Sequence, residues 1–147
     1  MNIPLRVKNL ASRHNTRDPI RIAKALNIEI KYVPFKETKG FFIKCMRNKY
    51  IVINSHLDEF SQTVVLAHEL GHQQLHSSRR DILQFEKGVW QFHDESIFDV
   101  NCILEREANK FAAELLIHES LIYDSIDLCS TDLSQQLYIE LIKLKGE

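Results

Sequence analysis

Residues 58–77 read DEFSQTVVLAHELGHQQLHS, and the apolar residues of this stretch recur at the spacing of an α-helix. The recurring residues, which would form one core-facing side of the helix, are Phe60, Val64, Ala67, Gly71 and Leu75. Either Ser55 or Asp58 can cap the first turn, because both side chains can accept hydrogen bonds from the free backbone N–H groups there. We therefore expect a central helix from about residue 58 to about residues 75–77, with the other elements packed around it.

Gly71 is unusual inside such a helix. Glycine costs about 1 kcal/mol relative to alanine in a helix interior, so its presence calls for a reason. We interpret Gly71 as a place where another backbone approaches closely, and the simpler alternative is a tolerated imperfection.

The same helix carries the pattern His68-Glu69-Leu70-Gly71-His72. His68 and His72 lie one helical turn apart on the same face, so both imidazoles can reach one metal ion. Glu69 lies close to that face, where its carboxylate can hydrogen-bond a water beside the metal without becoming a ligand. This H-E-x-x-H arrangement is typical of zinc peptidases, in which the glutamate is the general base. The simpler alternative is a helix with two solvated histidines.

A catalytic zinc ion normally takes three protein ligands, so the two histidines need a third. The preferred candidate is Glu105, which lies on a second segment with strong helical spacing, expected to begin near Ile103. Asn109 follows Glu105 by one turn and can accept a hydrogen bond from the second ring N–H of a ligating histidine, which fixes its tautomer.

Other polar residues near these motifs have weaker claims. Glu107 and Glu114 fall elsewhere around the second helix and are interpreted as solvated charges. His76 and His93 could serve as extra ligands or as donors to the transition state, but an ordinary polar role is the more frequent one for such residues.

The N-terminal third of the chain predicts helices followed by a small sheet. Residues 1–16 have only a weak helical period. Asp18-Pro19 predicts a helix start, with Asn27 at the helix end. The alternation from Ile28 to Tyr32 predicts a half-buried strand. Residues 41–46 and 50–53 predict a hairpin, with Asn48 in a left-handed conformation at its turn.

The C-terminal half predicts a long connection and one more helix. Residues 78–100 have little periodicity but contain several aromatic side chains, which cover the core or, in the sharper interpretation, form a wall for a substrate. Ser130 or Thr131 can cap a final amphipathic helix, interpreted as a packing element rather than a dimerisation surface. We therefore predict an α+β fold, a three-stranded sheet packed with several helices, in one domain over residues 1–147.

Composition narrows the class of protein further. A chain of 147 residues can bury roughly two-thirds of its unfolded surface, so no metal is needed merely to hold it together. A formal net charge of −1 gives no general attraction to phosphates, which disfavours direct nucleic-acid binding. We see neither a signal peptide nor an apolar run of the ~18 residues that a membrane span needs, so we expect a soluble cytoplasmic protein. Cys45, Cys102 and Cys129 are interpreted as buried thiols in a reducing compartment.

Two motifs together resemble the ImmA/IrrE family of metallopeptidases. They are Ala67-His68-Glu69-Leu70-Gly71-His72 and the segment from Glu105-Arg106-Glu107-Ala108-Asn109 through Leu116, and the likeness extends over residues 18–117. The resemblance implies that Glu105 is the third zinc ligand, in an arrangement similar to that of thermolysin-type peptidases. Family members often continue the Leu-Leu run with Met-Pro, whereas this chain continues with Ile117-His118.

By this resemblance the protein would bind Zn²⁺ through His68, His72 and Glu105 and would cleave a helix-turn-helix repressor, with Glu69 as the general base. It looks like the stand-alone form found beside repressors in phages and other mobile elements, and no feature of the sequence indicates an oligomeric state. One alternative is a zinc-stabilised module that sequesters a repressor or antitoxin without cutting it. Another is a toxin that a neighbouring antitoxin neutralises.

Overall fold

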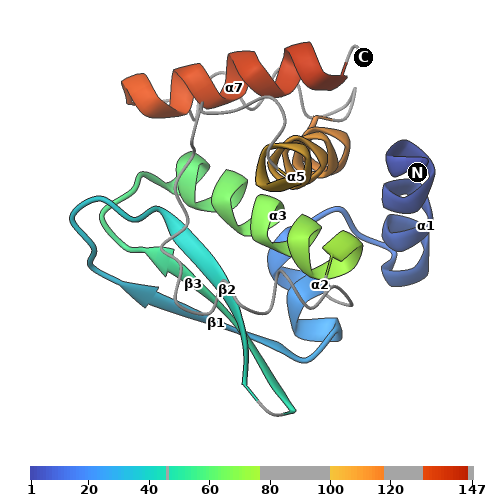
Figure 1. The fold of residues 1–147 in the computed structure, drawn as a ribbon, viewed down its shortest axis with the longest axis horizontal. Coiled ribbons are helices and arrows are strands. Elements are labelled where there is room, and N and C mark those ends of the chain that lie inside the picture. The colour runs from blue at the N-terminus through green and yellow to red at the C-terminus, as the bar shows by residue number, and fades with distance from the viewer. Residues whose placement is uncertain (46, 77–99, 118–130, 146–147) are drawn as a thin grey trace.

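The computed structural model describes residues 1–45, 47–76, 100–117 and 131–145 and shows an α+β fold, as predicted. Within these ranges, five helices pack with a three-stranded sheet, and α3 lies between the sheet and the pair α5 and α7 (Figure 1). The elements are α1 (Ile3–His14), α2 (Pro19–Ala25), β1 (Ile28–Val33), β2 (Gly40–Cys45), β3 (Asn48–Asn54), α3 (Glu59–His76), α5 (Val100–Leu116) and α7 (Asp132–Lys145).

The sheet has the order β1-β3-β2. The predicted hairpin is present, because β2 and β3 are antiparallel neighbours, whereas β1 pairs with β3 in parallel. The prediction for Asn48 is wrong: Asn48 is the first residue of β3 and pairs with Cys45. Positive φ among the described non-glycine residues occurs at Asn15 and Asn27 instead, one and two residues after the end of a helix. Pairing with Cys45 places Asn48 in the ladder rather than in the loop.

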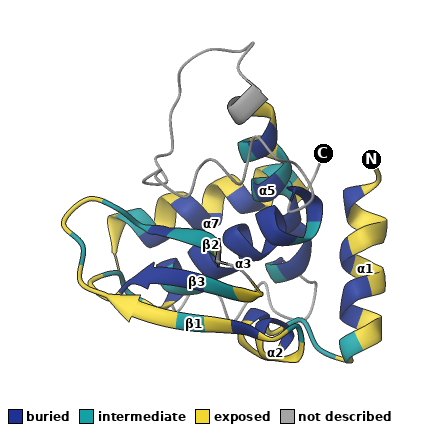
Figure 2. Ribbon diagram, turned by 60° about the horizontal axis from the view of Figure 1, so that its bottom comes forward, coloured by how far each residue is buried: buried dark blue, intermediate teal, exposed yellow. Residues whose placement is uncertain are grey.

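Helix α3 begins and ends where its sequence predicts. Asp58 is the cap, since its carboxylate accepts hydrogen bonds from the backbone N–H and the hydroxyl of Ser61. Side chains on all faces of α3 are buried, because the sheet packs on one face of the helix and α5 with α7 on the other (Figure 2). The sheet can lie close to the helix at Gly40, where a Cβ atom would come within 2.6 Å of Val65 Cγ1.

The predicted N-caps of α2 and α7 are also present. Asp18 Oδ1 accepts a hydrogen bond of 2.9 Å from the backbone N–H of Ile20 at the start of α2. At the start of α7, the Thr131 hydroxyl accepts one of 3.0 Å from the backbone N–H of Ser134. Thr131 also donates to Asp58, so the starts of α3 and α7 are joined by one hydrogen bond of 2.9 Å.

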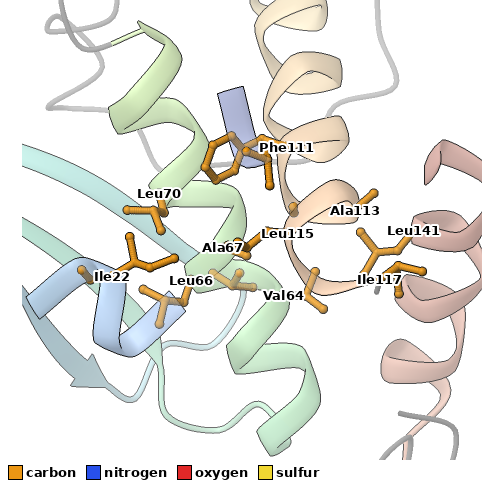
Figure 3. Packing of buried hydrophobic residues seen from close by; sticks show 14 of the residues in the cluster. Ile22, Val64, Leu66, Ala67, Leu70, Phe111, Ala113, Leu115, Ile117 and Leu141 are labelled. Atoms are coloured by element: carbon orange, nitrogen blue, oxygen red, sulfur yellow. The ribbon is translucent and has the colours of Figure 1, made fainter. Parts of the chain in front are cut away.

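The hydrophobic core receives residues from every described helix and lies on both sides of α3. Leu66 and Leu70 face Ile22 of α2 on one side, while Val64 and Ala67 face α5 and α7 on the other (Figure 3). The apolar stripe of α7 packs against α5, as its interpretation as a packing element predicts. Helix α1, for which the sequence signal was weak, packs its buried side against α5.

Helix α5 begins at Val100, earlier than the predicted Ile103. Nearly all of the predicted connection at residues 78–100, with His93 and its aromatic residues, lies outside the described residues. Cys129 lies outside them too, as do the side chains of Cys45 and Cys102. None of the helices in the described ranges is both long enough and apolar enough to cross a membrane.

Candidate metal centre

Two helices that are distant in sequence bring the predicted site residues together. His68, Glu69 and His72 come from α3, and Glu105 and Asn109 come from α5. The two helices are packed closely at Gly71, where a Cβ atom would lie 3.0 Å from the Cβ of Phe111. The sequence predicted that another backbone would approach Gly71. The structure places the side chain of Phe111 there instead, and its Cβ is fixed to the backbone of α5.

Three side chains converge on one point. The Nε2 atoms of His68 and His72 are 3.1 Å apart. One carboxylate oxygen of Glu105 lies 3.3 Å from His68 Nε2, and the other lies 3.3 Å from His72 Nε2. The candidate ligand atoms of the three residues all lie within 4.8 Å of one another. Two imidazoles and a carboxylate form the donor set of many catalytic zinc sites.

The electrostatics of the three residues fit a bound cation. Burial lowers the pKa of His68 to about 3 and that of His72 well below its usual range. Burial, together with the nearby Glu69, raises the pKa of Glu105 to about 9. One buried oxygen of Glu105 has no hydrogen-bond partner among the described residues. A divalent cation at this point would satisfy that oxygen and favour the ionised carboxylate and the neutral imidazoles, which are the forms that bind metals.

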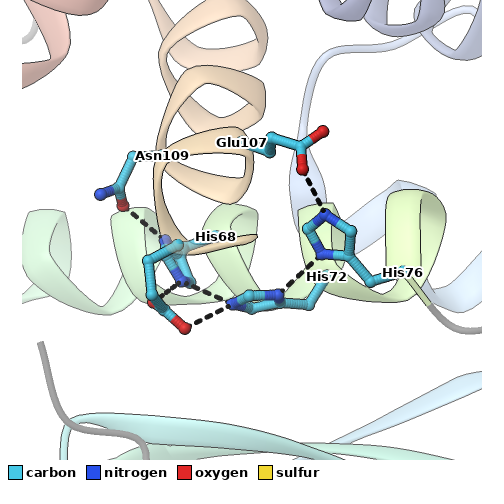
Figure 4. A network of polar contacts seen from close by, with 6 residues as sticks. His68, His72, His76, Glu107 and Asn109 are labelled. Carbon is cyan, nitrogen blue, oxygen red and sulfur yellow. Dashed lines mark hydrogen bonds and ion pairs between the residues drawn. The ribbon is translucent and has the colours of Figure 1, made fainter. Parts of the chain in front are cut away.

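Asn109 determines which nitrogen of His68 faces Glu105. The Nδ1–H of His68 donates a hydrogen bond of 2.6 Å to Asn109 Oδ1 (Figure 4). A neutral imidazole carries one proton, so this bond leaves the lone pair of Nε2 directed at the convergence point.

Glu69 is fully buried beside this group but is not one of the three convergent residues. Neither of its carboxylate oxygens has a hydrogen-bond partner among the described residues, and burial raises its pKa well above the usual range. A buried carboxyl group without other partners, beside three convergent ligands, is placed to exchange a proton with a molecule bound there.

The structure corrects the interpretation of two other glutamates of α5. Glu107 is not simply solvated: its side chain is 23% exposed and one of its oxygens lies 3.5 Å from Nε2 of His76. Glu114 is buried and forms ion pairs with Lys110, at 3.0 Å, and Lys145, at 2.6 Å. Helical periodicity shows which side of a helix faces the core, but it does not show which neighbouring helix supplies a partner.

His76 is the site neighbour that the sequence indicated least clearly. It is 1% exposed, and its Nδ1 lies 3.0 Å from Nδ1 of His72. The available signal was its spacing, since His68, His72 and His76 follow one another at single-turn intervals on the same helix face.

Two histidines and a glutamate are the ligands of several zinc peptidases, and comparison with known proteins points to the same class. Residues 23–134 match the family Peptidase_M78, described as the IrrE N-terminal-like domain. The match covers most of the chain, which therefore belongs to this metallopeptidase family.

The chain also has a relative from a phage. The chain is 36% identical over 119 residues to "Uncharacterized immunity region protein 2" of Bacillus phage phi105. The alignment covers 79% of this chain and 68% of that protein.

Proposed function

We propose that this protein is a zinc-dependent endopeptidase that cleaves a helix-turn-helix repressor of a phage or other mobile element and so relieves repression. The observation that supports it most directly is the convergence of His68, His72 and Glu105 with the buried carboxylate of Glu69 beside them. Membership of a metallopeptidase family supports the reaction class. The immunity region named for the phage relative supports a repressor as the substrate.

In the proposed site, His68, His72 and Glu105 would hold the zinc ion, and Asn109 would keep His68 in its ligating tautomer. Zinc, when bound, supplies a Lewis acid that polarises the peptide carbonyl and makes a water molecule more acidic. Glu69 would take the proton of the attacking water and deliver it to the leaving amine. Its burial keeps the proton from exchanging with bulk solvent before delivery.

The role of Glu69 is tested by Glu69→Gln, which keeps the shape of the side chain and removes its basicity. We expect the purified variant to retain zinc, measured by elemental analysis, because Glu69 is not among the three ligands. Cleavage of the cognate helix-turn-helix repressor, followed by gel electrophoresis and mass spectrometry, should slow by about 100-fold or more, the usual contribution of a general base.

A matched control is Glu59→Gln, the same substitution at an exposed position in the first turn of the same helix. This variant should cleave at the wild-type rate. Wild-type cleavage by Glu69→Gln would overturn the assigned role of Glu69. If Glu69→Gln failed to cleave but still relieved repression in cells, the protein would be a binding module that sequesters its target rather than a peptidase.

A further inference from the structure

The imidazole of His72 contacts a second buried histidine on its own helix. His76 lies one turn after His72 on α3, and the two Nδ1 atoms are 3.0 Å apart (Figure 4). Their ring centroids are 5.2 Å apart, so the contact runs between ring edges rather than stacked faces. The Nδ1 atom is the one on the far side of the His72 ring from Nε2, which faces Glu105.

This contact constrains the protons of both rings. If Nε2 of His72 is to offer a lone pair to a metal, Nδ1 of the neutral ring must carry the hydrogen. That Nδ1–H then donates to Nδ1 of His76, which must be an acceptor. A neutral His76 with an acceptor at Nδ1 carries its own hydrogen on Nε2.

An acceptor faces that second nitrogen. Oε1 of Glu107, on α5, lies 3.5 Å from Nε2 of His76, which is within ion-pair distance, although the buried Nε2 makes no hydrogen bond within the described part of the chain. A carboxylate favours an N–H over a lone pair at the nitrogen that faces it. The contacts from Glu107 through His76 to His72 therefore favour one placement of the ring hydrogens. His76 carries its hydrogen on Nε2, His72 carries its hydrogen on Nδ1, and Nε2 of His72 keeps a lone pair.

We propose that His76 and Glu107 are positioning residues that hold His72 in its metal-binding tautomer and orientation. The inference rests on the proposed metal site and extends it. Helix α5 would then support both histidine ligands in addition to supplying Glu105: Asn109 acts directly on His68 at 2.6 Å, and Glu107 acts on His72 through His76. Neither His76 nor Glu107 would touch the substrate.

The experiment measures zinc affinity of the full chain by competition with a chromophoric chelator. Groups that orient a metal ligand typically contribute 10-fold to 100-fold in affinity. We expect His76→Phe, which keeps an aromatic ring and removes the acceptor for His72, to weaken zinc binding by about 10-fold to 100-fold. Glu107→Ala should weaken it by about 10-fold, because His76 remains and loses only its own support.

Glu107→Gln separates hydrogen bonding from charge, since its amide oxygen can still accept from Nε2–H of His76. It should retain most of the affinity that Glu107→Ala loses. Glu140→Ala removes the same charge from an exposed position on α7 and should bind zinc as tightly as the wild type. Equal losses in Glu107→Gln and Glu107→Ala would make charge alone the cause and overturn the proposed positioning.

A second readout reports the tautomer directly. Long-range proton–nitrogen correlation NMR of the zinc-loaded wild type should show His72 with its hydrogen on Nδ1 and His76 with its hydrogen on Nε2. The opposite assignment at His76, or wild-type zinc affinity in folded His76→Phe and Glu107→Ala, would overturn the inference. These outcomes differ from failure of the proposed function, in which the wild-type protein itself would not bind zinc or would not cleave.

Discussion

Buried and partly buried glutamate residues of α3 and α5 have pKa values shifted in opposite directions, because their neighbours differ. Glu69 and Glu105 are surrounded by apolar packing and neutral imidazoles, so burial raises the pKa of both. Glu114, on the same helix as Glu105, lies between two lysines whose hydrogen bonds and charges outweigh the effect of burial and lower its pKa. Only the first pair is arranged to exchange a proton or to accept a cation near neutral pH.

The raised pKa of Glu105 predicts how the stability of the metal-free protein changes with pH. In the unfolded chain Glu105 loses its proton near its ordinary pKa of 4.5, whereas in the folded protein it retains it up to about 9. Between these values the folded state binds more protons, so raising the pH favours unfolding. Urea unfolding in a chelator should therefore give a lower free energy of unfolding at pH 8.5 than at pH 6, and Glu105→Gln should make the decline shallower.

The buried histidines make the free energy of unfolding change with pH in the opposite direction, at lower pH. The pKa of His68 falls from 6.5 to about 3 on folding, so the unfolded state binds more protons between these values and stability decreases as the solution is acidified. The metal-free protein should thus be most stable where the two effects offset each other, at about pH 4.5–6.5. A free energy of unfolding that rises from pH 6 to pH 8.5 would contradict the assignment of Glu105 as a buried, protonated acid.

At the scale of elements, the site depends on how closely α5 approaches α3. The two helices contribute different ligands, so a small shift of one relative to the other changes the distances between both histidines and Glu105. Gly71 permits this approach, and the atom that it accommodates most closely is the Cβ of Phe111. A change of side-chain rotamer cannot move a Cβ atom, so any relief must come from movement of a helix backbone.

Gly71→Ala tests this contact. Alanine favours the helix by about 1 kcal/mol, but overpacking a tight core typically costs about 1–3 kcal/mol. Because Phe111 is 1% exposed and its Cβ would lie 3.0 Å from the new methyl group, we expect a net loss of about 1–2 kcal/mol in urea unfolding. Zinc affinity should also fall, since α5 carries Glu105. A variant that is more stable than the wild type would show that α5 has room to move.

At the scale of the whole molecule, periodicity and capping residues predicted most elements but not their neighbours. The period of residues 58–77, with a cap at Asp58, predicted α3, alternation predicted β1, and runs of aromatic and β-branched residues predicted the hairpin of β2 and β3. Alternation shows which side of a strand is buried and not which strand pairs with it, so the parallel pairing of β1 with β3 was not predictable. Helix α1 was hard to recognise because its buried face is narrow and most of its other residues are polar.

The difference between local patterns and contacts across elements also explains which site residues could be predicted from the sequence. His68 and His72 lie together because of helical geometry alone, so their spacing was sufficient. Glu105 and Asn109 were selected because they lie one turn apart on a second strongly periodic segment, and the resemblance of two motifs to one family supported Glu105. The contact between His76 and Glu107 depends on where α5 crosses α3, which no local pattern in the chain encodes.

The core and the metal site contribute separately to stability, which predicts how the molecule responds to removal of zinc. The buried cluster draws on every described helix and does not include the three ligands, so the chain should keep its helical circular dichroism in a chelator. Zinc binds the folded state, and at 100 times its dissociation constant it should add about 2.7 kcal/mol, or roughly 5–10 °C in Tm. His72→Ala should abolish this shift while remaining folded. Loss of helical signal in the chelator would instead mean that the metal is needed for folding, as in small zinc domains.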